Sequence, residues 1–436
     1  MKYLYIAIKK NYMKKIALFL LVSAFLFSCA TDDPKVDPTQ ADPTDEAPTD
    51  EFPTDDDTTV PPAAGPITAP CENGFAGSFY PCNGFDLVYQ ISLGVFDAGS
   101  GNDSWGWTDP DTGKEYAIMG LSGGTAFIDI SDIENVVIVG FLETETTSSA
   151  WRDIKVYQNH AYIVSEASGH GMQVFDLTHL RGAGTDNEFS PDNVYTEFGN
   201  AHNIVINEES GYAYAVGTGT FGGGPHFINI QDPLNPVAAG GYALGSYSHD
   251  AQVITYNGPD TEHQGKEILI GSNANEVVIV DISNKNNPIE LSTIGYGQTA
   301  YTHQGWFTED HTYFLVGDEL DETTYGFTTR TIVFDFTDLD NPNLKVEYFG
   351  PTPAIDHNGY VKGDRYYLAN YTAGMRVIDI SDIANGNLIE VGYFDTHNLF
   401  DAAAFRGAWN VYPFFESGHI IISDMNYGLF IVKKSS

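Results

Sequence analysis

Short apolar runs separated by polar turn residues extend through most of the chain and indicate its secondary structure. Between residues 154 and 198, the runs "IKVYQN", "HAYIVSE", "MQVFDL" and "NVYTEF" are bounded by Gly, Asn and Asp. Runs of this length and composition are typical of β-strands, and four of them predict one four-stranded antiparallel sheet. Helical periodicity is absent from this repeat and from the others. The pattern therefore predicts an all-β fold.

The third run of this repeat recurs along the sequence at intervals of 44 to 54 residues. Its copies are "TAFIDISD", "MQVFDLTH", "HFINIQDP", "VVIVDISN", "TIVFDFTD", "MRVIDISD" and "GLFIVKKS", with Asp129, Asp176, Asn229, Asp281, Asp335, Asp379 and Lys433 at the shared position. Such a period indicates a radial or linear repeat architecture. Sheets of four strands leave both faces apolar, and packing around an axis buries those faces. The repeats therefore predict a seven-bladed β-propeller over residues 71–436.

The last repeat lacks a fourth strand. It contains "AWNVYP", "HIIISD" and "GLFIVK", and the sequence ends three residues later. The run "FDLVYQISLG", from Phe85 to Gly94, resembles the fourth strands of the other repeats and precedes the first complete one. We therefore expect this N-terminal strand to complete the last blade and close the ring.

Several motifs resemble a known family. "FIDISD", "VIVDIS" and "VIDISD" look like LVIVD repeats, and the sequence from "CENGFAGSFYPC" through "SSAWRDIKVYQNHAYIVSEASGHGMQVFDL" to "AHNIVINEESGYAYAVG" is similar to the choice-of-anchor B family. The resemblance covers nearly everything after residue 70. It implies a protein exported to, or anchored at, the cell surface by anchors that vary between members. It implies no established reaction.

The N-terminus has the features of an export signal. Lys14 and Lys15 precede the apolar run "IALFLLVSAFLF", which is followed by Ser28 and Cys29. The run is too short for a transmembrane helix and has the flanks of a signal peptide. We interpret residues 1–28 as a lipoprotein signal peptide and Cys29 as the lipidated residue; the alternative is a secretory signal with an incidental cysteine. The expected location is the cell envelope, anchored to the outer membrane and exposed at the surface.

Residues 29–70 are rich in Asp, Glu, Thr and Pro, as in "DPTQADPTDEAPTDEFPTDDD". Low hydrophobicity and like charge predict a disordered tether between anchor and propeller. The whole chain has a formal charge of -39, which argues against nucleic acid as a partner because phosphates are repelled. The expected partners are the membrane, through the lipid, and a glycan, peptide or envelope protein.

Cys71 and Cys82 are the only cysteines besides Cys29. They are eleven positions apart, with Gly74 and Gly77 between them. In an exported protein this arrangement predicts a disulfide-closed loop rather than two buried thiols.

Candidate functional residues come from the loop that opens each repeat. The aligned positions are Ser104, Arg152, His202, His249, His303, His357 and Arg406. The first strand of each blade lines the channel of a propeller, so we expect the four histidines, from consecutive blades, to converge near the axis. Five tryptophans lie within three residues of an aligned position: Trp105, Trp107, Trp151, Trp306 and Trp409.

Three interpretations of this ring are open. The histidines could form structural hydrogen bonds between blades. They could hold one transition-metal ion, zinc or iron, with Asp153 and Asp250 orienting the rings. Arg152, Arg406, the tryptophans and the two aspartates could instead bind a glycan, peptide or small anion at the channel mouth.

No motif identifies a catalytic residue, so an enzymatic activity is left open. Glu166 and His170 lie close in sequence but without an accompanying nucleophile, and His170 is interpreted as a turn residue. The acidic segment "DELDE", residues 318–322, is interpreted as a solvated loop. The favoured function is a binding module; the alternatives are a metal-dependent enzyme that uses the four histidines and a scaffold for protein interactions.

Overall fold

Antiparallel strands make up nearly all of the regular structure in this computed structural model, which describes residues 68–243 and 247–436. The predicted signal peptide, Cys29 and almost all of the predicted tether lie outside the described residues. Within the described ranges, no helix is long and apolar enough to cross a membrane.

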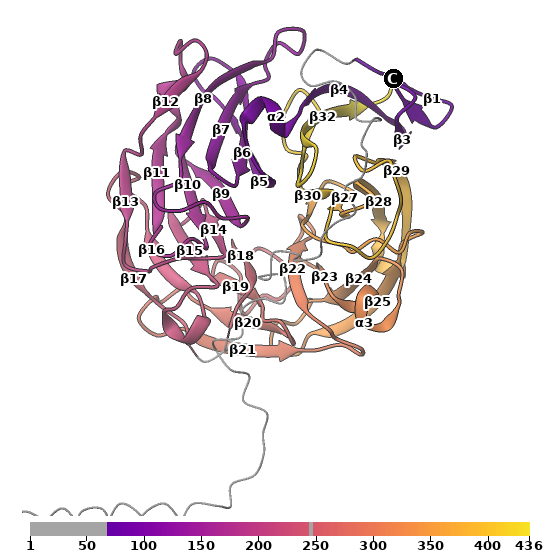
Figure 1. Cartoon of the computed structure of the whole chain (residues 1–436). Coiled ribbons are helices and arrows are strands. Elements are labelled where there is room, and N and C mark those ends of the chain that lie inside the picture. The colour runs from indigo at the N-terminus through magenta and orange to yellow at the C-terminus, as the bar shows by residue number, and fades with distance from the viewer. Residues whose placement is uncertain (1–67, 244–246) are drawn as a thin grey trace, which may run out of the picture. The chain divides into compact units, whose positions relative to one another are not determined.

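The strands form seven sheets, and six of these are blades built from one continuous stretch of chain (Figure 1). The first three blades are β5 (Gly101–Thr108), β6 (Glu115–Leu121), β7 (Gly124–Asp129) and β8 (Val137–Glu143); β9 (Arg152–Tyr157), β10 (His160–Ser165), β11 (Met172–Asp176) and β13 (Asn193–Tyr195); and β14 (Asn203–Asn207), β15 (Tyr212–Val216), β16 (His226–Asn229) and β17 (Val237–Gly241). A short strand, β12 (Asn187–Phe189), adds to β8 in parallel.

The next three blades follow the same order from the axis outwards. They are β18 (Asp250–Thr255), β19 (Glu267–Ser272), β20 (Val277–Asp281) and β21 (Ile289–Ile294); β22 (Thr302–Phe307), β23 (Tyr313–Asp318), β24 (Arg330–Asp335) and β25 (Asn343–Phe349); and β26 (Gly359–Lys362), β27 (Arg365–Ala369), β28 (Met375–Asp382) and β29 (Asn387–Phe394). The helical segments are short: α2 (Leu93–Phe96), α3 (Asp321–Tyr325), η1 (Leu177–Leu180), η2 (Phe221–Gly223) and η3 (Ile383–Asn385).

The remaining sheet is a composite of the two ends of the described chain. It contains β30 (Ala408–Tyr412), β31 (His419–Asp424) and β32 (Gly428–Lys434), and its fourth strand is β4 (Phe85–Ile91). β4 pairs antiparallel with β32, with Phe85 opposite Lys434 and Ile91 opposite Leu429. An all-β propeller with four-stranded antiparallel blades is therefore confirmed, as is the N-terminal strand in the last sheet. The repeats found in the sequence correspond to six continuous blades and this composite sheet.

The first strand of each sheet faces the axis. These inner strands are β5, β9, β14, β18, β22, β26 and β30; each contacts the next, and β30 contacts β5. Figure 1 shows the resulting ring. The residues that open the repeats therefore meet at one end of a shared channel.

Apolar side chains between adjacent sheets form the core. Between the first two blades, Ile118, Phe127, Ile163 and Phe175 are fully buried, and the rings of Phe127 and Phe175 stack with centroids 4.6 Å apart. Each such side chain contributes roughly 1.5–3 kcal/mol when it leaves water. A single sheet could not bury these side chains, so neighbouring blades stabilise one another.

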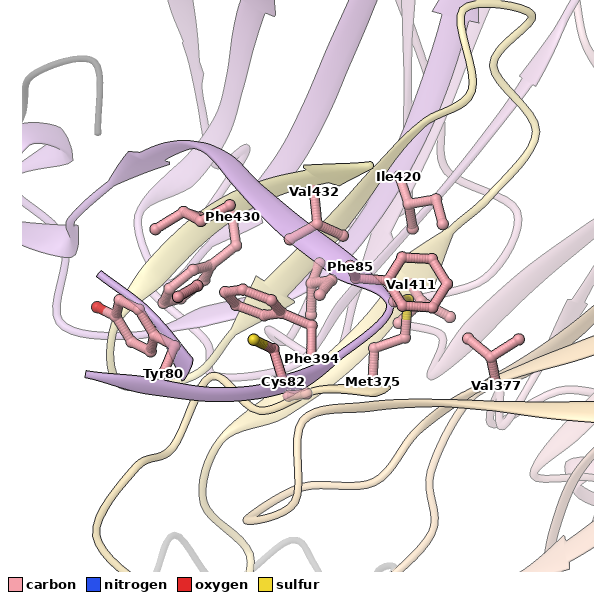
Figure 2. Close-up of a cluster of buried hydrophobic side chains, with 14 of the residues drawn as sticks. Tyr80, Cys82, Phe85, Met375, Val377, Phe394, Val411, Ile420, Phe430 and Val432 are labelled. Atoms are coloured by element: carbon pink, nitrogen blue, oxygen red, sulfur yellow. The ribbon is translucent and has the colours of Figure 1, made fainter. Parts of the chain in front are cut away.

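An N-terminal hairpin extends across the junction between the last two sheets (Figure 2). Its strands are β1 (Cys71–Glu72), β2 (Phe75–Ala76) and β3 (Tyr80–Asn83), and β3 pairs with β29. Tyr80 packs edge-on against Phe430 of β32, with ring centroids 5.3 Å apart. A disulfide joins Cys71 to Cys82, as predicted. Ordered pairing starts slightly before residue 71, because Ala69 bridges to Leu87.

Candidate metal centre

Four histidines lie at the starts of four consecutive inner strands, β14, β18, β22 and β26. Their imidazoles follow one another around the axis, with centroid distances of 4.2 Å from His202 to His249, 4.3 Å from His249 to His303 and 4.4 Å from His303 to His357. All four side chains are buried. The structure thus brings together the residues that the sequence placed in consecutive blades. We call these four residues the histidine arc.

Hydrogen bonds at Nδ1 orient three of the rings. Nδ1 of His249 lies 3.0 Å from the carbonyl oxygen of His303, and Nδ1 of His357 lies 2.6 Å from that of Trp409. Nδ1 of His202 contacts a carboxylate oxygen of Glu166. Because carbonyl and carboxylate oxygens accept hydrogen bonds, Nδ1 carries the proton in each neutral ring. Nε2 is then the nitrogen with a lone pair for a metal, as in most metal-binding histidines.

Glu319 adds a carboxylate to the histidine arc, and no sequence motif predicted this. It follows β23 and is fully buried. Its two carboxylate oxygens lie 3.6 Å from Nε2 of His303 and 3.6 Å from Nε2 of His357. The hydroxyl of Tyr371 donates a hydrogen bond to Oε1 of Glu319 at 2.7 Å. Ligand atoms of His303, Glu319 and His357 all lie within 4.8 Å of one another, and two imidazole nitrogens with one carboxylate oxygen suit zinc or iron.

Burial favours the neutral form of His303. It lowers the pKa of His303 well below its usual value, and the neighbouring rings of His249, His357 and His202 lower it further. A neutral imidazole does not have to lose a proton before it coordinates an ion. His303 is therefore in the form that a metal ligand requires.

In the first blade and in the composite sheet, the residue equivalent to the four histidines differs from the one predicted. In β9, Asp153 accepts the backbone N–H of Ile204 at 2.7 Å; in β5, Asp103 accepts that of Ile154 at 3.0 Å. The position equivalent to Arg152 in the first blade is therefore Asn102, and the expectation of Ser104 was wrong. β5 also shifts its register between Gly101 and Ser104, which an alignment by spacing cannot detect.

The composite sheet shows the same effect. Trp409, rather than Arg406, continues the histidine arc, with its ring centroid 4.4 Å from that of His357. The register of β30 shifts between Ala408 and Asn410. Arg406 precedes β30, and its charge lowers the pKa of His397 after the larger effect of burial. The alignment of Arg406 with the histidines was therefore wrong.

Arg152 lies at the start of β9 but is engaged between blades. Its Nε donates to the carbonyl oxygen of Leu121 at 3.3 Å, and its Nη1 lies 3.1 Å from Nε2 of His170. Burial lowers the pKa of Arg152 to about 10. Burial also lowers the pKa of His170 to about 4, and the charge of Arg152 is a smaller cause of this shift. His170 is fully buried rather than exposed in a turn, and Glu166 pairs with His202 instead of His170.

Asp153 and Asp250 lie one residue further along the inner strands. Nζ of Lys155 lies 2.7 Å from Oδ1 of Asp153 and 3.7 Å from Oδ2 of Asp103. Burial raises the pKa of Asp250 to about 7, and the charge of Asp153 adds to this effect. Oδ1 of Asp250 accepts its neighbouring backbone N–H, that of Ala251, at 2.6 Å. These aspartates, with Lys155, form a charged layer that links the inner strands below the histidine arc.

The five tryptophans occupy three separate places. Trp151 and Trp409 pack together near the histidine arc. Trp107 is in the core and stacks on Tyr116, with centroids 5.1 Å apart. Trp105 and Trp306 line a cavity further along the inner strands. The expectation that all five surround one pocket was therefore wrong, because successive strand residues point to opposite faces.

The acidic segment after β23 is buried, so its interpretation as a solvated loop was wrong. Asp318, Asp321 and Glu322 are each less than 4% exposed. Arg330 is the nearby cation, with Nε 2.6 Å from a carboxylate oxygen of Asp321. Burial raises the pKa of Glu322 to about 11, assisted by the charges of Asp356 and Asp321. Glu319 is held within this segment, which fixes its position beside His303 and His357.

Comparison with known proteins supports the fold. The LVIVD repeat model matches residues 265–294 and 360–396, which include strands of the blades containing β20 and β28. The chain is therefore a β-propeller that contains LVIVD repeats. No curated protein matches the chain in sequence.

Two solved structures share the arrangement at low identity. Hydrazine synthase of Kuenenia stuttgartiensis has a TM-score of 0.50 and 12% identity, covering 73% of this chain and 92% of that chain. A protein from Lactobacillus plantarum has a TM-score of 0.51 and 13% identity, covering 74% of this chain and 89% of that chain. At such identity the similarity concerns the fold alone.

Proposed function

We propose that this chain is a binding module whose propeller holds one divalent transition-metal ion, zinc or iron, at His303, His357 and Glu319. The observation that carries the proposal is the mutual proximity of the three ligand atoms, within 4.8 Å, in a buried position. His249 and His202 continue the same arc and supply further imidazoles.

A metal-dependent enzyme is the second candidate function. Three protein ligands leave at least one coordination position of zinc for water or a substrate, as catalytic zinc sites do. Structural zinc sites usually have four protein ligands. If His249 provides a fourth ligand, the site is closed and the ion is structural. The coordination number of the bound ion therefore distinguishes the two candidates.

The cellular address forms part of the proposal. The basic residues and the apolar run before Cys29 support lipidation of that cysteine after cleavage of residues 1–28. The acidic, Pro-rich composition up to residue 70 supports an extended tether. Similarity to the choice-of-anchor B family is consistent with surface anchoring. The molecule would then present its propeller away from the outer membrane, where it could meet a glycan, peptide or envelope protein.

Elemental analysis tests the metal directly. The purified protein is dialysed against a chelator, reloaded with Zn²⁺ or Fe²⁺ and freed of excess ion; we expect about one ion per chain. His303→Ala and His357→Ala should each lose it, since each removes one of three ligands. The control is His179→Ala, which changes an exposed histidine of η1 that forms a surface pair with Asp192.

Circular dichroism and thermal unfolding of each variant show whether it is folded. If an alanine variant is unfolded, His303→Gln takes its place, because glutamine keeps the volume and polarity but not the imidazole. Retention of a stoichiometric ion by both folded variants would contradict the proposal, as would the absence of a bound ion in the reloaded wild type.

A further inference from the structure

A cavity of about 410 Å³ lies at the opposite end of the inner strands from the histidine arc. Its walls come from β5, β9, β14, β18, β22 and β30 and from the loops that follow β14 and β30. The four histidines lie just before or near the first residue of their inner strands, whereas the cavity residues lie several positions later in the inner strands or in the loops after them. Because each strand residue spans about 3.3 Å, the cavity is separate from the histidine arc. A volume of this size is within the range of small-ligand sites.

One wall of the cavity is aromatic. Trp105, Trp306, Tyr412 and Phe414 contribute to it, and all four are half-buried although they lie near the axis. The rings support one another: Trp105 and Tyr412 are 5.1 Å apart by centroid, and Tyr412 and Phe414 are 5.3 Å apart. Aromatic faces carry partial negative charge, which attracts the C–H groups on the apolar side of a sugar ring.

The opposite wall is polar and is held in place by hydrogen bonds. Asn207, Gln252 and Thr255 come from β14 and β18. Nδ2 of Asn207 donates to Oγ1 of Thr255 at 3.3 Å, which joins the two strands. Oε1 of Gln252 accepts the backbone N–H of Phe307 at 2.8 Å, so the donors of its amide are the groups suited to a ligand. Glu208, which is exposed, adds a carboxylate acceptor. Oriented amides and carboxylates both recognise hydroxyl groups.

The charges at the cavity disfavour an anionic ligand. Lys155 is the lysine in its wall, and the charges of Asp153 and Asp103 compensate its ammonium group. The carboxylates of Glu208 and Glu209 repel anions. The ammonium group of Lys155 already lies over the Trp105 ring, with Nζ 4.7 Å from the ring centroid. The cavity therefore disfavours anions.

We propose that this cavity binds an uncharged pyranose unit of a glycan, stacked on Trp306 and Tyr412 and hydrogen-bonded to Gln252 and Glu208. This site differs from the predicted one in both place and chemistry, because it does not use Arg152, Arg406 or an anionic group. It shares no ligand residue with the metal centre. Either site can therefore fail without the other.

Fluorescence titration of the purified full chain tests the inference. Cellobiose and maltose are the probes, and choline and glucuronate are the charged comparisons. We expect one or both disaccharides to change the tryptophan emission in a saturable manner, and the charged compounds to bind more weakly. Trp306→Leu and Glu208→Gln should each weaken binding about tenfold, because each removes one main contact. The variant Glu262→Gln, at an exposed loop position, should bind as the wild type does.

Three outcomes would overturn the inference. In the first, neither disaccharide binds at concentrations up to roughly 50 mM, which is weaker than typical recognition. In the second, choline or glucuronate binds as tightly as the better disaccharide. In the third, Trp306→Leu and Glu208→Gln bind the sugar like the wild type, so the sugar lies elsewhere. If Trp306→Leu does not fold, Glu208→Gln decides the third outcome. Metal content, measured in the same samples, reports separately on the histidine arc.

Discussion

The two ends of the inner strands differ in chemistry although the strands are repeats of one another. At one end, buried imidazoles follow each other at 4.2–4.4 Å and approach the carboxylate of Glu319. At the other end, Trp105, Trp306 and Tyr412 enclose a cavity beside neutral amides. Each blade contributes about one side chain to each layer of the channel, so a few substitutions set the chemistry of a layer. Function in this propeller therefore depends on particular positions rather than on the repeat.

The charged layer between the two ends gives the largest expected effect. Lys155→Met removes the cation that compensates Asp103 and Asp153, and we expect a loss of roughly 3–5 kcal/mol in the free energy of unfolding. Lys114→Met is the matched control, because Lys114 forms an exposed pair with Asp129 at 2.6 Å and such pairs contribute at most about 1 kcal/mol. Urea unfolding of both variants is the measurement. Equal losses would show that the layer does not act as a buried charge network.

Metal should stabilise the histidine end independently of the aromatic end. Zn²⁺ at a hundred times its dissociation constant would raise the free energy of unfolding by about 2.7 kcal/mol. His303→Ala should abolish this gain, and Trp306→Leu should retain it. Unfolding curves with Zn²⁺ and with a chelator provide the test. A gain of the same size in both variants would place the ion elsewhere.

The hydroxyl of Tyr371 should have a smaller effect, confined to the histidine end. Tyr371→Phe removes the hydrogen bond to Glu319 at 2.7 Å, and we expect about 1.5–2 kcal/mol less stability in the apo protein. Zn²⁺ affinity, measured by competition with a chelator, should fall about tenfold because the carboxylate is less well oriented. Tyr162→Phe is the control: the hydroxyl of Tyr162 donates to the carbonyl of Pro233, and its loss should leave metal affinity unchanged.

His311 should produce the smallest effect, at the aromatic end. Burial lowers its pKa below the ordinary value, and its Nδ1 accepts the backbone N–H of Asn257 at 3.1 Å. As pH falls, His311 therefore gains a proton in the unfolded chain before it does so in the folded protein. The stability that it contributes is present above the unfolded pKa of about 6.5 and is lost as pH falls below that value. His311→Gln should remove the loss in the free energy of unfolding that protonation of His311 causes at low pH, which is less than about 1 kcal/mol. Identical pH dependence of unfolding in both proteins would contradict the assignment.

The sequence was sufficient to predict the blades because their signals are local and repeated. An Asp or Asn near the end of the third strand marks six of the seven repeats, and Phe85 starts a strand whose apolar pattern matches the missing partner of β32. The convergence of His202, His249, His303 and His357 followed from the same spacing. These predictions needed only strand order and the direction of each inner strand.

The remaining parts of the site depend on irregular geometry and on distant partners. The observed equivalents of Arg152 in β5 and β30, Asn102 and Trp409, lie two and three residues from the expected ones, and both strands contain register shifts. Glu319 belongs to an acidic segment whose composition is typical of solvated loops. The segment is buried because later parts of the chain supply partners: Arg330 pairs with Asp321, and Tyr371 donates a hydrogen bond to Glu319. Local composition cannot reveal such long-range compensation.

The pairing of β4 with β32 determines how the propeller would respond to tension. Any pull transmitted through the residues before Thr68 enters the ring at Ala69 and the N-terminal hairpin. The disulfide between Cys71 and Cys82 carries that load past the intervening residues and delivers it to Asn83 and Phe85. Force is then resisted jointly by the pairing of Cys82 and Asn83 with β29 and by the ladder between Phe85–Ile91 and Gly428–Lys434.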